Sequence, residues 1–151
     1  MDHDRLLASI KLHEGYRQLP YLDSLGHWTV GYGHLLQDSL QSSVFKTVGG
    51  LLDHITDKVQ HQMWLESDMA YAVGSASGWV GSSTWNKLSD ERQEVLVEMC
   101  FQLGNRTRKF VKFRQAVIDG DWPQAVAEMR DSMWYSQTPG RVDDLAKKLL
   151  S

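Results

Sequence analysis

Residues 20–34, with the sequence PYLDSLGHWTVGYGH, carry a pattern that is typical of β-structure. β-forming side chains stand on both sides of the turn-rich segment DSLG, namely Tyr21 before it and Trp28, Thr29, Val30 and Tyr32 after it. This pattern predicts a β-hairpin. Elsewhere the apolar residues mostly recur at helical spacing, so we expect an α+β protein in which a small sheet accompanies many helices.

The N-terminal segment is predicted to be a helix that ends at a carboxylate. Its apolar residues Leu6, Leu7 and Ile10 recur at helical spacing. Gly15 can end such a helix, because glycine readily adopts the left-handed conformation that often follows a last helical turn. The helix should therefore end at or next to Glu14.

A long helix is predicted to follow a polar, weakly patterned stretch at residues 37–50, which we interpret as a loop with a short helix. Thr56 is the expected N-cap, and the Gly/Ser-rich residues 74–83 are expected to end the helix. Its apolar residues, among them Val59 and Met63, lie on two adjoining stripes and indicate packing on more than one side. Such a helix can connect two lobes.

The C-terminal half is predicted to be helical. Ser89 and Asp121 are the expected N-caps, Gly104 is an expected stop, and the TPG sequence at 138–140 should separate the last helix from its predecessor. The helix that follows Ser89 has an apolar face that we expect to be buried, formed by Val95, Leu96, Met99, Cys100 and Leu103.

These elements predict one domain, residues 1–151, built from two lobes. The sheet-containing lobe covers about residues 15–56, and the linking helix covers about 57–74. A larger helical lobe covers about 75–151 and is joined by the first helix. A cleft is expected where the lobes meet.

Charge and cysteine content narrow the functional classes. The net charge of −3 gives no support to general nucleic-acid binding, although five Lys and Arg residues crowd into residues 106–114. This basic run is interpreted either as a solvated helix face or as a patch that meets an anionic polymer. The single cysteine, Cys100, is expected to be a buried apolar residue of a cytoplasmic protein. The acidic N-terminus does not resemble a signal peptide, and no apolar run is long enough to span a membrane.

Glu14, Asp23 and Thr29 have the chemistry of a hydrolase centre. Glu14 lies at the negative end of a helix dipole, which favours the protonated form that a general acid needs. Asp23 begins a turn, where backbone N–H groups and water favour the ionised form that a general base needs. Thr29 follows on a strand that should run back past Asp23, so its hydroxyl can hold a water against that carboxylate. Two carboxyl groups with opposite preferences are what glycoside hydrolysis requires.

Each of these residues also has a simple structural interpretation. A Glu before Gly at a helix end is usually a surface residue, and an Asp that opens a turn usually bonds to the backbone of that turn. A Thr in a strand is usually just a good β-former. Residue chemistry alone therefore leaves both interpretations open.

Three blocks of the sequence are informative through their order and spacing. Glu14 is followed by eight residues and Asp23, then by five residues and Thr29, within a segment that ends YLDSLGHWTVGYGH. CFQLG occupies residues 100–104 and WYSQTPGR occupies residues 134–141. Together the blocks resemble the phage-type lysozymes, the muramidases of glycoside hydrolase family 24, and most of all the T-even phage members. The resemblance covers nearly the whole chain.

This resemblance implies a lysozyme-like fold and cleavage of the β-1,4 bond between N-acetylmuramic acid and N-acetylglucosamine in peptidoglycan. It implies Glu14 as general acid, Asp23 as general base and Thr29 as the residue that positions the water, with inversion at the sugar. No cofactor and no metal is implied. A lytic transglycosylase that breaks the same bond is the closest alternative, and an inactive peptidoglycan-binding module is the other.

Further positions are carried over from the family. T-even members have an acid where this chain has Leu25, so the resemblance implies no lobe-bridging ion pair there. The position of His34 implies a structural ion pair with Asp68. The positions that match saccharide contacts are Leu35, Phe101, Phe113 and Glu128, of which the last two differ in side chain from the T-even pattern.

The resemblance also implies partners and a location. Peptidoglycan is the expected partner of a monomer that has no separate wall-binding domain, binds no nucleic acid and does not insert into a membrane. An endolysin without a signal peptide is expected to stay in the host cytoplasm until a holin opens the inner membrane, and then to reach the periplasm and cell wall. A free endolysin and a module of a larger assembly both fit this resemblance.

Overall fold

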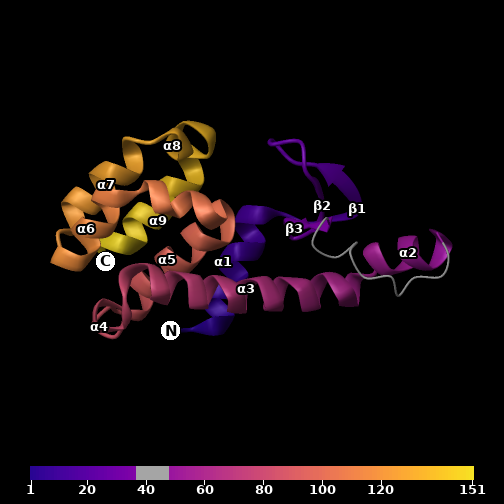
Figure 1. The fold of residues 1–151 in the computed structure, drawn as a ribbon, viewed down its shortest axis with the longest axis horizontal. Coiled ribbons are helices and arrows are strands. Elements are labelled where there is room, and N and C mark those ends of the chain that lie inside the picture. Colours follow the sequence, from indigo (N-terminus) through magenta and orange to yellow (C-terminus); the bar gives the residue numbers. More distant parts are fainter. Residues whose placement is uncertain (37–47) are drawn as a thin grey trace. The chain divides into compact units, whose positions relative to one another are not determined.

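The computed structural model of the protein describes residues 1–36 and 48–151 and confirms the α+β fold (Figure 1). The chain divides into two compact units, one formed by Leu7–Ala70 and the other by Met1–Leu6 with Tyr71–Ser151. The first unit contains the sheet, and the second is helical. The loop with a short helix predicted at 37–50 lies mostly outside the described residues. The cleft expected between the lobes stays a prediction.

The first helix, α1 (His3–Glu14), ends where the sequence predicts. Gly15 has a φ of 68°, and its backbone N–H donates to the Lys11 carbonyl over 3.0 Å. Because this left-handed conformation strains any residue that has a Cβ, glycine both ends the helix and fixes Glu14 at its last position.

The predicted hairpin is confirmed. β1 (Arg17–Leu22) pairs antiparallel with β2 (Trp28–Gly31), and their register sets Tyr21 opposite Thr29. The sequence pattern does not predict the third strand, β3 (His34–Leu35), which pairs antiparallel with β2. The sheet therefore has the order β1-β2-β3, with β2 at its centre.

An apolar cluster holds this sheet against two helices, α2 (Val48–Ile55) and α3 (Lys58–Val80). Its buried members are Val30 on β2, Leu36 after β3 and Ile55 at the end of α2, with Leu51 and Trp64 packed against them. Burial of Val30 therefore fixes the strand that carries Thr29.

The prediction that Thr56 caps α3 is wrong. The Thr56 hydroxyl donates to the Leu52 carbonyl over 2.8 Å and so belongs to the end of α2. The Asp57 carboxylate instead accepts from the Val59 N–H over 2.9 Å, and α3 begins at Lys58. Thr and Asp are both common N-cap residues. Because the Thr56 hydroxyl is bonded back to Leu52, Asp57 is the one that caps α3.

The linking helix ends within residues 74–83, as predicted, but later than the expected bound near residue 74. α3 passes through two glycines of that segment to Val80 and ends before Gly81, whose φ is 86°. A helical glycine costs about 1 kcal/mol relative to alanine, but every fourth residue here, Ala72, Ala76 and Val80, is buried. Burial of that face therefore outweighs the local preference for a stop.

Val59 and Met63 do not lie on a buried stripe of α3, contrary to expectation. Both side chains are exposed, whereas Leu65 and Met69 are buried. Because apolar residues surround much of this helix, the sequence spacing does not determine which stripe is covered.

The second unit is helical and includes the start of α1 and the end of α3. Its other elements are α4 (Ser82–Trp85), α5 (Asp90–Leu103), the 3₁₀ helix η2 (Gly104–Lys109), α6 (Val111–Asp119), α7 (Trp122–Arg130), α8 (Met133–Gln137) and α9 (Pro139–Leu150). Among the described residues, no helix is both long and apolar enough to cross a lipid bilayer.

The caps predicted for this unit are confirmed. The Ser89 hydroxyl and the Asp121 carboxylate each accept a backbone N–H from the first turn of α5 and α7, respectively. The five apolar side chains predicted on α5 are buried, and burial raises the pKa of the Cys100 thiol to about 11. The boundary predicted at residues 138–140 is confirmed at Thr138, which lies between α8 and α9. Pro139 and Gly140 already lie in the first turn of α9, a position that suits proline.

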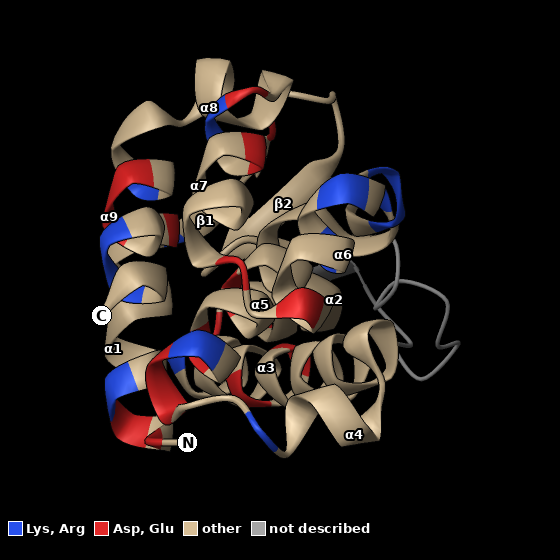
Figure 2. Cartoon of the chain, turned by 90° about the vertical axis from the view of Figure 1, so that its left-hand side faces the viewer, with Lys and Arg blue, Asp and Glu red and all other residues tan. Residues whose placement is uncertain are grey.

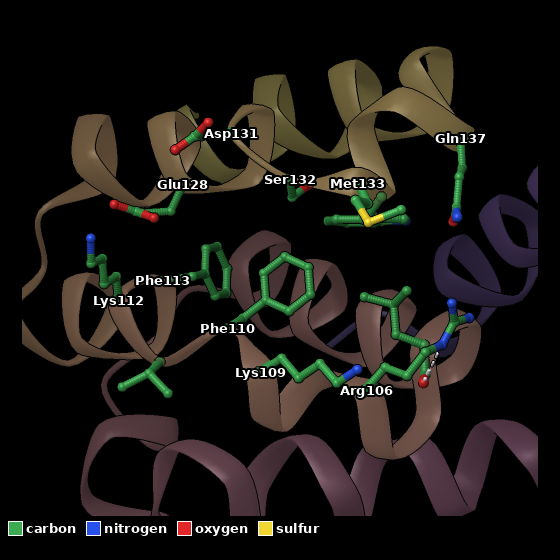
Figure 3. A pocket seen from close by; sticks show the side chains of 13 residues that line it. Arg106, Lys109, Phe110, Lys112, Phe113, Glu128, Asp131, Ser132, Met133 and Gln137 are labelled. Atoms are coloured by element: carbon green, nitrogen blue, oxygen red, sulfur yellow. Dashed lines mark hydrogen bonds between the residues drawn. The ribbon is translucent and has the colours of Figure 1, made fainter.

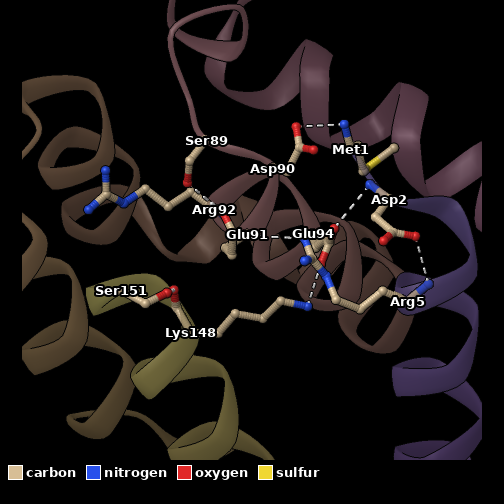
Figure 4. A network of polar contacts seen from close by, with 10 residues as sticks. All are labelled: Met1, Asp2, Arg5, Ser89, Asp90, Glu91, Arg92, Glu94, Lys148 and Ser151. Atoms are coloured by element: carbon tan, nitrogen blue, oxygen red, sulfur yellow. Dashed lines mark hydrogen bonds and ion pairs between the residues drawn. The ribbon is translucent and has the colours of Figure 1, made fainter.

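A buried carboxylate, Glu94 on α5, joins α1 to α9 (Figure 4). Its oxygens accept from Nε and Nη2 of Arg5 over 2.9 and 2.6 Å and lie 2.5 Å from Nζ of Lys148. Burial acts to raise the pKa of Glu94, but the hydrogen bonds from the two cations outweigh it, so this pKa lies below its ordinary value.

Glu94→Gln is expected to lower the free energy of unfolding by about 1.5–3 kcal/mol at pH 7, the range for hydrogen bonds to charged groups. Because the folded pKa of Glu94 is lowered, its contribution is present above the unfolded carboxyl pKa of about 4.3 and is lost as the pH falls through the folded pKa. Urea unfolding at pH 7 and at pH 3 measures both effects.

The matched control is Glu91→Gln, because the Glu91 side chain is 40% exposed and its carboxylate lies 3.4 Å from Arg5. An exposed pair of this kind contributes about 1 kcal/mol or less. Equal losses of stability in the two variants at pH 7 contradict the role assigned to Glu94.

Candidate active site

The Asp23 carboxylate is held by the turn between β1 and β2. Its Oδ1 accepts from the backbone N–H groups of Leu25 and His27 over 2.9 and 2.8 Å. Among the described residues, the ionisable group that faces its Oδ2 is the His27 imidazole, with Nδ1 at 3.8 Å. The turn therefore uses Oδ1, and Oδ2 is the oxygen that can accept a hydrogen bond from a water.

Thr29 is buried on β2 with its hydroxyl oriented by the same turn. Its Oγ1 donates to the His27 carbonyl over 3.0 Å, and that carbonyl also accepts from the Asp23 N–H over 2.9 Å. Because the hydroxyl proton is committed to a carbonyl, the Thr29 oxygen is left as an acceptor. The backbone of His27 thus fixes both Asp23 and Thr29.

Glu14 lies against the turn between β2 and β3. A Cβ built on Gly33 would be 2.8 Å from Oε2 of Glu14 and 3.4 Å from its carboxyl carbon. Gly33 also has a φ of 74°, which side chains with a Cβ rarely adopt. The turn therefore brings its backbone close to the Glu14 carboxylate at a position where only glycine fits.

Tyr21 lies opposite Thr29 in the strand register. Burial raises the pKa of its phenol, and the negative charges of Glu14 and, more weakly, Asp23 raise it further, while Arg17 acts in the opposite direction. Both carboxylates therefore act on the charge of one phenol, and Glu14, Asp23 and Thr29 all belong to the unit Leu7–Ala70.

Sequence reasoning missed Tyr21, His27 and Gly33 as parts of this site. The pattern treats Tyr21 only as a β-former and His27 only as a turn residue. The sequence GYG before His34 was the one available signal for Gly33, since a glycine beside a sheet often marks a close approach of the backbone.

The remaining carried-over residues of this unit lie beside the sheet. Leu35 on β3 pairs with Thr29 in the strand register. His34 places Nδ1 2.8 Å from Oδ2 of Asp68 on α3, and its ring stacks on Trp64 with centroids 4.3 Å apart. The structure thus places His34 in a polar and stacking contact that orients its ring, the arrangement of a structural residue.

The other carried-over positions lie in the helical unit. Phe101 is partly buried on α5. Phe113 on α6 and Glu128 on α7 line one pocket of about 560 Å³, whose apolar wall includes Phe110 (Figure 3). Phe113 is fully buried behind this lining and stacks on the Trp79 ring with centroids 5.7 Å apart, so the structure supports a packing role for it.

The basic run at 106–114 lies on η2 and α6, where Figure 2 colours Lys and Arg blue. Nε of Arg114 donates to the Trp79 carbonyl over 2.6 Å, and Nε of Arg106 donates to the Leu103 carbonyl over 3.4 Å. These two guanidinium groups support the backbone, whereas Arg108, Lys109 and Lys112 are exposed.

Within residues 1–36 and 48–151, no three His, Cys, Asp or Glu side chains are grouped as a metal site requires.

Comparison with known proteins gives one family and three similar proteins. The family model described as phage lysozyme matches residues 11–148. Probable T4-type lysozymes 2 and 1 of Dictyostelium discoideum are 28% and 26% identical over 145 residues, which cover 87% of this chain and 85% of each relative. The pre-baseplate central spike protein Gp5 of Enterobacteria phage T4 is 30% identical over 156 residues, which cover 94% of this chain and 27% of the spike protein.

These matches extend over the whole candidate site. The family match at residues 11–148 includes Glu14, Asp23 and Thr29, and the two lysozyme relatives are matched over most of their own length. The chain spans about a quarter of the spike protein. With its α+β fold, the chain belongs to the phage lysozyme family and is a muramidase-type cell-wall hydrolase.

Proposed function

We propose that this protein hydrolyses the β-1,4 bond between N-acetylmuramic acid and N-acetylglucosamine in peptidoglycan, with inversion at the anomeric carbon. The arrangement of Asp23 and Thr29 around the His27 backbone is the observation that carries this proposal. It leaves two acceptor oxygens, Oδ2 of Asp23 and Oγ1 of Thr29, for the two protons of one water.

In this proposal each of the three residues has one role. A water that donates one proton to Oδ2 of Asp23 and the other to Oγ1 of Thr29 keeps a lone pair for attack on the sugar. Glu14 protonates the oxygen of the leaving sugar on the opposite face. As the carbon–oxygen bond to the leaving sugar breaks, the water oxygen bonds to the anomeric carbon and its proton passes to Asp23. One displacement of this kind inverts the anomeric configuration.

The two alternatives make less use of these residues. A lytic transglycosylase closes an anhydro ring with a hydroxyl of the substrate, so it needs no oriented acceptors for a water. An inactive peptidoglycan-binding module needs no glycine beneath the Glu14 carboxylate, whereas Gly33 stands at that position here. Both features favour the hydrolase.

We further propose that the protein is an endolysin that acts as a monomer and causes lysis of the host cell. In this proposal it accumulates in the bacterial cytoplasm and reaches the cell wall after a holin opens the inner membrane. Its similarity to part of a phage spike protein supports a second setting, in which the same hydrolase domain belongs to a larger assembly.

The activity is tested by the loss of turbidity of a suspension of purified peptidoglycan. Wild-type protein is expected to clear the suspension, and Glu14→Gln, which cannot act as a strong proton donor, is expected to be slower by ~10² to 10⁴-fold. Far-UV circular dichroism checks that the variant is folded. Near-normal clearing by Glu14→Gln contradicts the proposed role of Glu14, and binding without clearing by the wild type indicates the inactive module.

A further inference from the structure

We propose that the His27 side chain is a positioning residue that competes with the nucleophilic water for Oδ2 of Asp23 and thereby sets the acid limit of activity. This inference rests on the proposed function, in which Asp23 is the general base. It concerns a side chain to which the family signature assigns no role.

The Asp23 carboxylate offers only one oxygen to a water or to an imidazole. Two backbone N–H groups, those of Leu25 and His27, already donate to Oδ1 over 2.9 and 2.8 Å. Oδ2 faces Nδ1 of His27 at 3.8 Å. The oxygen assigned to hold the water is therefore the one that the imidazole faces.

The distance of 3.8 Å between Nδ1 of His27 and Oδ2 of Asp23 allows this pair two states. It is too long for a hydrogen bond, so the present geometry leaves room for another partner at Oδ2. The His27 side chain is 45% exposed, so we expect its ring to be able to rotate toward the carboxylate. A protonated imidazole that closes this distance forms a charge-assisted hydrogen bond to Oδ2.

The backbone keeps the imidazole close to Asp23 in both states. His27 donates its N–H to Asp23 and accepts at its carbonyl from the Asp23 N–H and the Thr29 hydroxyl. These three bonds fix the Cα of His27 beside the carboxylate, so the competition depends on rotation of one side chain.

Among residues 1–36 and 48–151, Asp23 is the charged group that lies within ion-pair distance of His27. The Arg17 guanidinium lies over the Tyr21 ring at 4.4 Å, and the Glu14 charge acts on the Tyr21 phenol. Proton uptake by His27 is therefore expected to act first on Asp23.

The sign of the effect follows from the charge that His27 gains. Imidazole is the side chain that ordinarily changes charge between pH 5 and 8. As the pH falls, a protonated imidazole at His27 occupies Oδ2 and the water loses one of its two acceptors. Activity should therefore decline on the acid side of neutrality.

The test compares pH profiles of peptidoglycan hydrolysis by wild type, His27→Gln and the control His3→Gln, which removes an exposed imidazole from the other unit. Each rate at pH 5.5 is divided by the rate of the same protein at pH 7.5. The rates of wild type and His3→Gln are expected to fall about threefold to tenfold from pH 7.5 to pH 5.5. The rate of His27→Gln is expected to fall about twofold or less.

Superimposed profiles of His27→Gln and wild type overturn the inference, whatever the absolute rate of the variant. A merely structural role for His27 lowers the rate at every pH and keeps the shape of the profile. Asp23→Asn in the same assay distinguishes a failure of the role of His27 from a failure of the proposed general base. If Asp23→Asn is active, the proposed general base is wrong; if it is inactive and the profiles coincide, only the role of His27 is wrong.

Discussion

Asp23→Asn is expected to slow peptidoglycan hydrolysis by ~10² to 10⁴-fold, the usual contribution of a general base. Asparagine keeps a carbonyl oxygen that can accept from the Leu25 and His27 N–H groups, so the turn should stay intact. It places a neutral amide where Oδ2 stands, and a neutral amide cannot take the proton of the attacking water.

Initial rates of turbidity loss measure this effect, with unfolding in urea as the check on stability. Asp53→Asn is the matched control, because Asp53 is an exposed residue of α2 in the same unit. The control should keep the wild-type rate. An Asp23→Asn protein that also keeps it contradicts the assignment of Asp23 as general base.

Gly33→Ala is expected to lower the rate by about 10²-fold, the size of loss that a displacement of about 1 Å can cause in a catalytic group. The new Cβ would stand 2.8 Å from Oε2 of Glu14. Because Oε2 is the end of a flexible side chain, the carboxylate can move away, and it then leaves the position from which it protonates the leaving sugar. The variant should fold and bind peptidoglycan while hydrolysing it slowly.

Gly120→Ala separates this contact from backbone strain. Gly120 has a φ of 71°, close to the 74° of Gly33, but a Cβ there meets nothing within 4 Å. Both variants should lose about 1–2 kcal/mol of stability from the left-handed conformation, as measured by urea unfolding. Only Gly33→Ala should lose activity, and equal rates for the two variants would show that Glu14 does not depend on this turn.

Local chemistry allowed much of the fold to be predicted from the sequence. The end of α1 at Glu14, the hairpin around DSLG and the caps at Ser89 and Asp121 each depend on residues within a few positions of one another. Such local signals do not depend on tertiary packing, so they can be recognised in a single sequence.

Predictions failed where packing or competition decided the outcome. Thr56 and Asp57 are both capping types, and a bond back to α2 determines which of them begins α3. The glycines within residues 74–83 favour a stop, yet burial of Ala76 and Val80 continues the helix. The two-residue strand β3 is too short to show a period of its own.

The candidate site was predictable in its residue types and not in its contacts. Glu14, Asp23 and Thr29 could be named from their chemistry and from the resemblance. The approach of the Gly33 backbone to Glu14 depends on how α1 packs against a turn near the end of the sheet. The distinction between the two oxygens of Asp23 depends on which backbone N–H groups the turn presents, and no sequence spacing specifies that.

The central claim is that a water held by Asp23 and Thr29 attacks the sugar opposite the group that Glu14 protonates. Proton NMR of the products in the first minutes of digestion, before the anomers equilibrate, tests it most directly. Attack by that water on a β bond predicts reducing-end N-acetylmuramic acid that appears first as the α-anomer. Initial formation of the β-anomer, or of a 1,6-anhydro ring with no reducing end, would contradict it.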